Sequence, residues 1–210
     1  MVRFAADGDV AVFGGSFNPP HSGHIKLVEY CLEKLTLAGI ILLPAYDAPH
    51  KEEKAAAFRH RIHMLRLAFA HLAGRVNISI IEKYLERPSY TYKTMRELKK
   101  HCSRQQLCFI MGEDMFNYLP KWKNTAEIVS SYPLIVFNRG GADVEMLPLD
   151  FIRKPVVVTD FDYPISSTEF RQSLQQYYIT NDTEILDKLA LQLPPHVIDY
   201  MVEQRLYNND

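Results

Sequence analysis

Short apolar runs alternate with helically spaced segments along this chain, and that alternation restricts the possible folds more than any other feature. Residues 10–13 form an apolar run that ends at two glycines, and residues 25–35 then place apolar side chains three or four positions apart, as in a helix. Residues 40–43 and 59–72 repeat this order. Such alternation predicts parallel strands joined by right-handed helical crossovers. We therefore expect an α/β fold, a Rossmann-like doubly wound parallel sheet.

The rest of the chain continues the pattern and then becomes helical. Further strands are predicted at residues 76–81, 107–111, 134–137 and 156–159. Further helices are predicted at residues 91–101, 167–176, 182–191 and 195–204, which makes the C-terminal part helix-rich. No repeat, low-complexity tract or linker divides the 210 residues, so we expect one domain over residues 1–210.

The composition narrows the classes of partner. A formal net charge of −1 offers no basic surplus for nucleic-acid phosphates, although a small anionic ligand is compatible with it. No apolar run approaches the ~20 residues that span a bilayer, and the first residues lack a secretory pattern, so we expect a cytoplasmic protein without membrane contact. Cys31, Cys102 and Cys108 lack the spacing of a metal or redox site and are expected to be reduced, packed thiols.

The segment after the first strand carries the strongest chemical signal. Gly14 and Gly15 allow close approach to the backbone, and His21 and His24 stand three positions apart where the next helix begins, near Ser22. The first turn of a helix has unpaired N–H groups and a positive dipole, so it favours a phosphate. A glycine turn with two incidental histidines is the simpler explanation. However, His-x-Gly-His arises by chance in only about 1% of chains of this composition, so a phosphate site is preferred.

A second candidate site opens the helix predicted at residues 167–176. Ser166 and Glu169 have the spacing of a capping box, in which side chains satisfy backbone N–H groups at the helix start. Hydroxyls and amides at such a start, with Arg171 one turn further along, also suit a phosphate. The residues alone leave both roles open, and the two are compatible.

Three more segments follow predicted strands, at the edge where open α/β sheets bind ligands. Lys51 ends a Pro-His-Lys turn and is either a ligand or a solvated lysine. Tyr90 and Thr91 open a helix, which they either cap or use to hold a carboxylate. Asp114 and Trp122 come after the fourth strand, and the single tryptophan is either a core residue or a stacking surface for a heteroaromatic ring.

Residues 14–24 and 165–171 together resemble the His-x-Gly-His and Ser-Ser-Thr-x-x-Arg signatures of a nucleotidyltransferase superfamily distantly similar to class I aminoacyl-tRNA synthetases. The resemblance implies that ATP binds between the two motifs, with its nucleotide and phosphates contacted by Gly14, Gly15, Ser16, Phe17, His21, His24, Ser167, Thr168 and Arg171. The implied catalytic residues are His21, His24, which would stabilise charge at the α-phosphorus, and Arg171, which would neutralise the β- and γ-phosphates.

The order of motifs from about residue 10 to residue 171 resembles the nicotinate-nucleotide adenylyltransferase branch of that superfamily. This resemblance implies transfer of the adenylyl group of ATP to nicotinate mononucleotide, with release of pyrophosphate, by a single nucleotidyltransferase domain. The mononucleotide would contact Lys51, Tyr90, Thr91, Asp114 and Trp122. Mg²⁺ would arrive with ATP, and no residue is predicted as a metal ligand.

Some alternatives stay open at this point. Asn18 stands where the family also has Asp, Glu113 replaces a small residue, and Arg139 lacks the usual following proline. These departures concern fine specificity. A related adenylyltransferase or cytidylyltransferase, with pantetheine phosphate or nicotinamide mononucleotide as acceptor, is one alternative, and a non-catalytic nucleotide-binding relative is another. A homo-oligomer is also possible.

Overall fold

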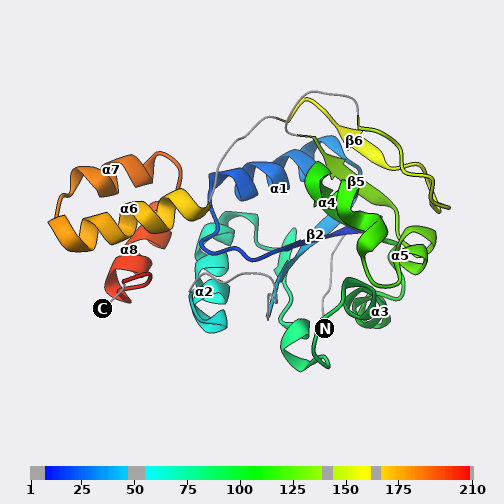
Figure 1. Cartoon of the computed structure of the whole chain (residues 1–210), viewed down its shortest axis with the longest axis horizontal. Helices are drawn as coiled ribbons and strands as arrows, with labels where there is room; N and C mark the ends of the chain where they lie inside the picture. Colours follow the sequence, from blue (N-terminus) through cyan, green and yellow to red (C-terminus); the bar gives the residue numbers. More distant parts are fainter. Residues whose placement is uncertain (1–7, 47–54, 139–143, 162–166, 209–210) are drawn as a thin grey trace.

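The computed structural model describes residues 8–46, 55–138, 144–161 and 167–208. Six parallel strands form one sheet in the order β3-β2-β1-β4-β5-β6 (Figure 1). The strands are β1 (Asp9–Gly15), β2 (Leu37–Pro44), β3 (Val76–Ile78), β4 (Leu107–Gly112), β5 (Leu134–Phe137) and β6 (Val156–Val158). The chain builds outward from β1 to β3, then returns to the other side of β1 with β4. The strand order therefore reverses between β1 and β4.

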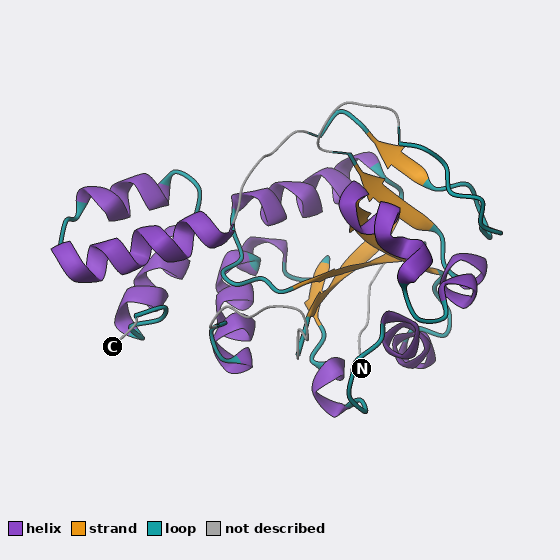
Figure 2. Ribbon diagram, viewed as in Figure 1, coloured by secondary structure: helices purple, strands orange, loops and turns teal. Residues whose placement is uncertain are grey.

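Helices cover both faces of this sheet (Figure 2). Their bounds are α1 (Ser22–Lys34), α2 (Phe58–Ala68), α3 (Thr91–His101), α4 (Glu113–Tyr118), α5 (Thr125–Ser131), α6 (Ser167–Thr180), α7 (Glu184–Ala190) and α8 (Pro195–Glu203), with short 3₁₀ turns at Ala70–Leu72, Ile81–Tyr84 and Leu119–Lys121. The predicted doubly wound α/β fold and its helix-rich C-terminal part are confirmed.

Alternation along the strands divides the apolar side chains between two cores. Ala11 of β1 packs with apolar residues of α1 and α2, whereas Val10 and Val12 point to the opposite face, toward α3, α4 and α5. Strands buried on both faces need nearly continuous apolar sequence, and the burial of all eight residues of β2 except Leu37 reflects this. The two cores hold the sheet in place from both faces, and they thereby position the edge at which the candidate site lies.

The last three helices form a group to one side of the sheet, beside α2 and the start of α1 (Figure 1). Leu174, Leu189 and Val197, one from each of α6, α7 and α8, belong to the same hydrophobic core as Ala11 of β1. The backbone N–H of Ser22, the first residue of α1, donates to the carbonyl of Gln192 at 2.9 Å. The group is thus joined to the start of α1 by a hydrogen bond as well as by apolar packing.

Two predicted elements end at least three residues early, and two helices were missed. The strand expected at residues 76–81 ends at Ile78, because the Ser79 hydroxyl accepts the N–H of Ile81 and favours a turn. The helix expected at residues 59–72 becomes a 3₁₀ turn after Ala68. Helices α4 and α5 have six and seven residues, too few for a helical period to be recognised in a sequence window.

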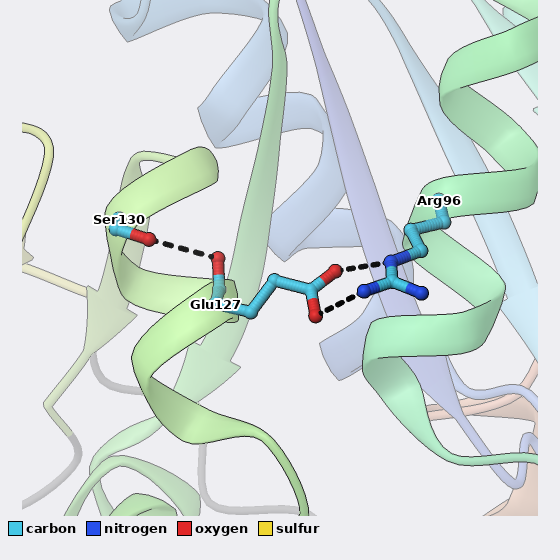
Figure 3. Close-up of polar contacts among 3 residues, drawn as sticks. All are labelled: Arg96, Glu127 and Ser130. Carbon is cyan, nitrogen blue, oxygen red and sulfur yellow. Dashed lines mark hydrogen bonds and ion pairs between the residues drawn. The ribbon is translucent and has the colours of Figure 1, made fainter.

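An ion pair joins α3 to the missed helix α5 (Figure 3). The Arg96 guanidinium donates from Nε and Nη2 to the two carboxylate oxygens of Glu127, the second bond measuring 2.6 Å. The hydroxyl of Ser130 donates to the Glu127 carbonyl at 3.4 Å, one turn along α5. A solvent-exposed pair of this kind contributes little to stability. The buried Met95 and Val129 pack these helices into the same hydrophobic core as the strands.

Other expectations concern cysteines and membranes. The three cysteines are free and buried, as predicted, and burial raises the pKa of the Cys31 and Cys108 thiols to about 12. Within the described part of the chain, no helix has the length and apolar character needed to span a membrane.

Candidate active site

The candidate site lies where the strand order reverses, at the carboxyl ends of β1 and β4. Open α/β sheets bind ligands in the crevice at this point, because the loops leaving the two strands turn to opposite faces. Gly14 and Gly15 end β1, and Gly112 ends β4. The sequence motifs that follow these glycines are therefore brought to the same edge of the sheet.

The two histidines of the first motif lie face to face at the start of α1. Their ring centroids are 3.7 Å apart and the rings are inclined by 27°. His21 is the N-cap of α1, and its backbone N–H donates to Nδ1 of His24 at 3.2 Å. When the His24 ring is neutral, this bond places its proton on Nε2, which makes Nε2–H a donor suited to a phosphate oxygen.

The loop before the histidines is shaped by a buried aromatic ring. Phe17 is 1% exposed and has a φ of 46°, a left-handed conformation that is uncommon for residues with a side chain. Its ring packs against His24 at 4.9 Å between centroids. A β-carbon on Gly15 would approach the same ring to 3.2 Å, so the close packing here favours glycine. Phe17 thus serves as packing for the motif.

The second motif contacts the first directly. The hydroxyl of Ser167, at the start of α6, donates to the carbonyl of Pro19 at 3.1 Å. Arg171 donates from Nη1 to the carbonyl of Asn18 at 2.9 Å and from Nη2 to the hydroxyl of Thr168 at 3.1 Å. Burial lowers the pKa of Arg171, which nevertheless stays protonated at neutral pH. Ser166 lies outside the described residues, so the capping-box prediction is not tested.

Asn18 is the centre of this contact. Its side-chain oxygen accepts hydrogen bonds from the Ala56 N–H at 3.0 Å and from the Tyr207 hydroxyl at 2.8 Å. Arg61 of α2 holds the same loop from another side, donating from Nη1 to the Ser16 carbonyl at 2.8 Å. Arg61 and Arg171 are both buried, which gives the motif loop two positive charges. A polyphosphate would be favoured beside them.

The residues predicted for a second ligand belong to elements that pack on the face of the sheet opposite α1. Tyr90 is the N-cap of α3 and is 39% exposed, and Thr91 begins the helix. Glu82, which sequence reasoning missed, is buried beneath them: its carboxylate accepts the Tyr46 N–H at 3.0 Å and the Thr94 hydroxyl at 3.4 Å. Burial raises the pKa of Glu82 against the opposing effect of these bonds.

Asp114 and Trp122 are placed by the missed helix α4 and the turn after it. Asp114 is exposed in the first turn of α4, with Oδ1 2.5 Å from where a β-carbon on Gly112 would lie, so this carboxylate folds back over the end of β4. Trp122 is partly buried and meets the Phe109 ring edge-on, with centroids 6.1 Å apart. Phe109 also lies 3.6 Å from the β-carbon position of Gly14, so its ring adjoins both Trp122 and the end of β1.

Comparison with known proteins places these motifs in a family. The sequence pattern of the cytidylyltransferase-like family matches residues 12–173. The nicotinate-nucleotide adenylyltransferase of Bacillus subtilis is 33% identical over 203 residues, covering 95% of this chain and 98% of that protein. The chain belongs to the nicotinate-nucleotide adenylyltransferase family. The described residues of the two motifs lie at the end of β1, at the start of α1 and at the start of α6.

Two solved structures share the fold of this family member. The nicotinic acid mononucleotide adenylyltransferase of Plasmodium falciparum, complexed with NaAD, has a TM-score of 0.75 at 18% identity, covering 95% of this chain and 97% of that one. The same protein complexed with APC has a TM-score of 0.74 with the same identity and coverage. At this identity the likeness concerns the fold.

Several residues of this nicotinate-nucleotide adenylyltransferase family member were not foreseen as part of the site, and one predicted residue is not described. Lys51 lies outside the described residues. Arg61 had a detectable signal, since it occupies a position on the apolar stripe of α2 beside Ile62, where a charged side chain needs a buried partner. Tyr207 gave no signal, because it follows α8 by four residues and reaches Asn18 only through the tertiary fold.

Proposed function

We propose that this chain is a nicotinate-nucleotide adenylyltransferase, which joins the phosphate of nicotinate mononucleotide to the α-phosphorus of ATP and releases pyrophosphate. The observation that carries the proposal is the stacked pair His21 and His24 at the start of α1, beside the point where the strand order reverses. The His21 ring also contacts Phe170 of the second motif, with centroids 5.6 Å apart. Family membership supports the same reaction.

The chemistry asks for positioning and charge neutralisation. The second pKa of a phosphate monoester is about 6, so the nucleophile is already largely dianionic at neutral pH and needs no general base. Two anions must approach in line with the departing pyrophosphate. His21 and His24 would contact the triphosphate, with His24 at the α-phosphorus, while Ser167, Thr168 and Arg171 would hold the phosphates from the start of α6. Gly14, Gly15, Ser16 and the backbone of Phe17 would line the nucleotide.

The metal would enter as part of the substrate. In the ranges that the structure describes, no group of three or more His, Cys, Asp or Glu residues could hold a metal ion. Mg²⁺ prefers oxygen ligands and retains several waters. Its ligands would therefore be phosphate oxygens of ATP together with those waters. The bound ion would lower the negative charge that the nucleophile must approach.

The acceptor would lie on the β4 side of the site. Trp122 presents a partly buried indole near the end of β4, and a planar pyridinium ring can stack on it. Tyr90 and Thr91 would supply donors for the acceptor carboxylate at the start of α3, with Lys51 and Asp114 completing the site. We further propose a single catalytic domain and a cytoplasmic location, supported by the core shared with the C-terminal helices and by three buried free thiols.

The decisive experiment is pyrophosphate release from ATP, measured separately with nicotinate mononucleotide, nicotinamide mononucleotide and pantetheine phosphate as acceptors. The proposal requires release with the first and formation of the dinucleotide product. Release only with pantetheine phosphate would assign the chain to another branch of the superfamily. ATP binding without release in any of the three reactions would indicate a non-catalytic nucleotide-binding protein.

A further inference from the structure

Tyr207 connects the C-terminal helices to the first motif. It follows α8, and its hydroxyl donates to the side-chain oxygen of Asn18 at 2.8 Å across 189 positions of sequence. The side chain is partly buried, and burial raises the pKa of Tyr207 despite the opposing positive charges of Arg171 and Arg61. The hydroxyl therefore keeps its proton at neutral pH and remains a donor.

The backbone around Tyr207 is folded back toward the motif. Arg205 and Tyr207 have φ values of 47° and 64°, a conformation that residues with side chains seldom adopt. Leu206, between them, is buried in the core that α6, α7 and α8 share with β1. Two left-handed residues in three positions persist only where surrounding contacts hold them. The structure thus directs this tyrosine inward at the cost of local strain.

The bond to Asn18 completes a set of contacts that fixes the loop at residues 16–18. The Asn18 side-chain oxygen uses both acceptor positions, one for Tyr207 and one for Ala56. Its backbone carbonyl binds Arg171, and the Ser16 carbonyl binds Arg61. Segments before α2, within α2, within α6 and after α8 therefore converge on this loop. Loss of one bond would let the loop and Arg171 move together.

We propose that Tyr207 is a positioning residue for ATP: its hydroxyl fixes Asn18, and through Asn18 it aligns Arg171 and the loop that precedes His21. The proposal rests on the proposed function for the identity of the ligand. It assigns to the chain after α8 a part in the nucleotide site, beyond the two motifs. Tyr207 itself need not touch ATP.

A second tyrosine provides a matched control. The hydroxyl of Tyr178 in α6 donates to the Met201 carbonyl in α8 at 2.9 Å, and burial raises the pKa of Tyr178 to about 12. This bond lies within the same helical group, and its acceptor lies in α8, away from the motif loop. Tyr178→Phe therefore removes a comparable hydrogen bond from the group while leaving the Asn18 contact in place.

The experiment measures ATP binding at equilibrium, without acceptor, together with steady-state kinetics and thermal unfolding. Tyr207→Phe is expected to raise the Kd and the KM for ATP about five- to tenfold, as for the loss of one buried hydrogen bond, while the KM for the mononucleotide at saturating ATP changes less than about twofold. Tyr178→Phe is expected to leave both ATP constants within about twofold of wild type. Equal effects of the two substitutions on ATP would reduce Tyr207 to a general stabilising role.

A double-mutant cycle tests the route through Asn18. Asn18→Leu removes the acceptor from the other side of the same bond and is expected to weaken ATP binding at least as much as Tyr207→Phe does. The double variant should then bind ATP within about twofold of Asn18→Leu alone. If the two substitutions weakened ATP binding independently, so that the fold-losses multiplied in the double variant, the proposal would be overturned. If Tyr207→Phe failed to fold, unchanged ATP binding in Asn18→Leu would also overturn it. Because the binding assay needs no turnover, absence of the reaction in the wild type would contradict the proposed function and leave this test intact.

Discussion

The two halves of the candidate site differ in how firmly the protein holds them. On the ATP side, Asn18, His21 and Arg171 are each less than 10% exposed, and hydrogen bonds from α6, α2 and the chain after α8 converge on one short loop. On the acceptor side, Tyr90 is 39% exposed and Asp114 is exposed in the first turn of a six-residue helix. The sheet positions both halves, and the hydrogen bonds described between distant segments gather mainly on the loop of the first.

This difference has a thermodynamic consequence. Groups that are already ordered lose little conformational freedom when a ligand binds, so the side that we propose to bind ATP would be preorganised for a phosphate chain. Exposed groups on the proposed acceptor side would become ordered only when the ligand binds, and they would lose more conformational freedom. We therefore expect substitutions on the ATP side to affect ATP binding together with local stability. Acceptor-side groups should instead govern which mononucleotide is used.

Discrimination between acceptors is the largest effect that we expect. Nicotinate and nicotinamide mononucleotides differ by a carboxylate against an amide, which stacking on Trp122 cannot distinguish. In the proposed site, the choice would come from donors near Tyr90 and Thr91 at the start of α3. A mismatch that leaves buried polar groups badly paired costs ~2 to 4 kcal/mol, so kcat/KM should favour the acid by roughly 30- to 1,000-fold. Steady-state kinetics with both acceptors measure this ratio.

Trp122→Ala provides the matched variant for that measurement. Because the indole is assigned to the acceptor, its loss should lower kcat/KM for both mononucleotides while the Kd for ATP stays close to that of wild type. Equal use of the two acceptors by the wild type would contradict the nicotinate assignment. Unaltered kinetics in Trp122→Ala would leave the indole with only its packing against Phe109.

Arg171→Ala should give the next largest effect, this time on ATP. The guanidinium holds Asn18 and is assigned to the β- and γ-phosphates, and a charge-assisted bond of this kind contributes ~1.5 to 3 kcal/mol. The kcat/KM for ATP should fall roughly 10- to 150-fold, with a lower midpoint of thermal unfolding as well. Arg171→Lys keeps the charge without the fork of donors and should recover only part of the loss. Unchanged kinetics for ATP would leave this segment as a helix cap.

His24→Ala separates chemistry from folding on the same side. The ring stacks on His21 and contacts Phe17 at a tilt but remains half-buried, so its removal should take away a proposed phosphate contact and little core packing. We expect kcat to fall at least about tenfold, as is typical of a lost charge-stabilising donor, with little change in the urea midpoint. A near-wild-type kcat would refute the phosphate role, and loss of activity through unfolding would make the histidine structural.

Sequence reasoning predicted the strand and helix that carry the first motif more completely than the long-range contacts that hold the motif loop. Strand β1, the helix starting at Ser22 and the motif histidines are local features, because periodicity and helix-terminus chemistry act over a few residues. Asn18 was noticed only as a departure from the family pattern, and its partner Tyr207 is 189 positions away. Contacts of that range depend on how the C-terminal helices pack, which no local pattern encodes. Helices α4 and α5 were missed for a different reason, since each is about two turns long.

The smallest effect that we predict concerns pH: it tests whether the contact between α2 and α8, beside the proposed ATP side, stabilises the fold less in acid. His60 of α2 precedes Arg61, and its Nδ1 lies 2.8 Å from the Tyr200 hydroxyl of α8, a contact that joins the C-terminal helices to the helix holding Ser16. Burial lowers the pKa of His60 below its ordinary 6.5, with smaller contributions from the positive charges of Arg59 and His63. The unfolded chain therefore takes up this proton more readily than the folded one.

Stability contributed by neutral His60 is present above pH 6.5 and is lost as the pH falls from there toward the folded pKa. The free energy of unfolding of the wild type should thus decrease between about pH 7.5 and 5.5. His60→Asn keeps an acceptor for the Tyr200 hydroxyl but cannot be protonated in this range, so its stability should decrease less over the same interval. Urea unfolding of both proteins at the two pH values measures the difference. Parallel decreases would show that the contact between α2 and α8 is insensitive to acid, and the ATP side would then keep its preorganisation throughout that range.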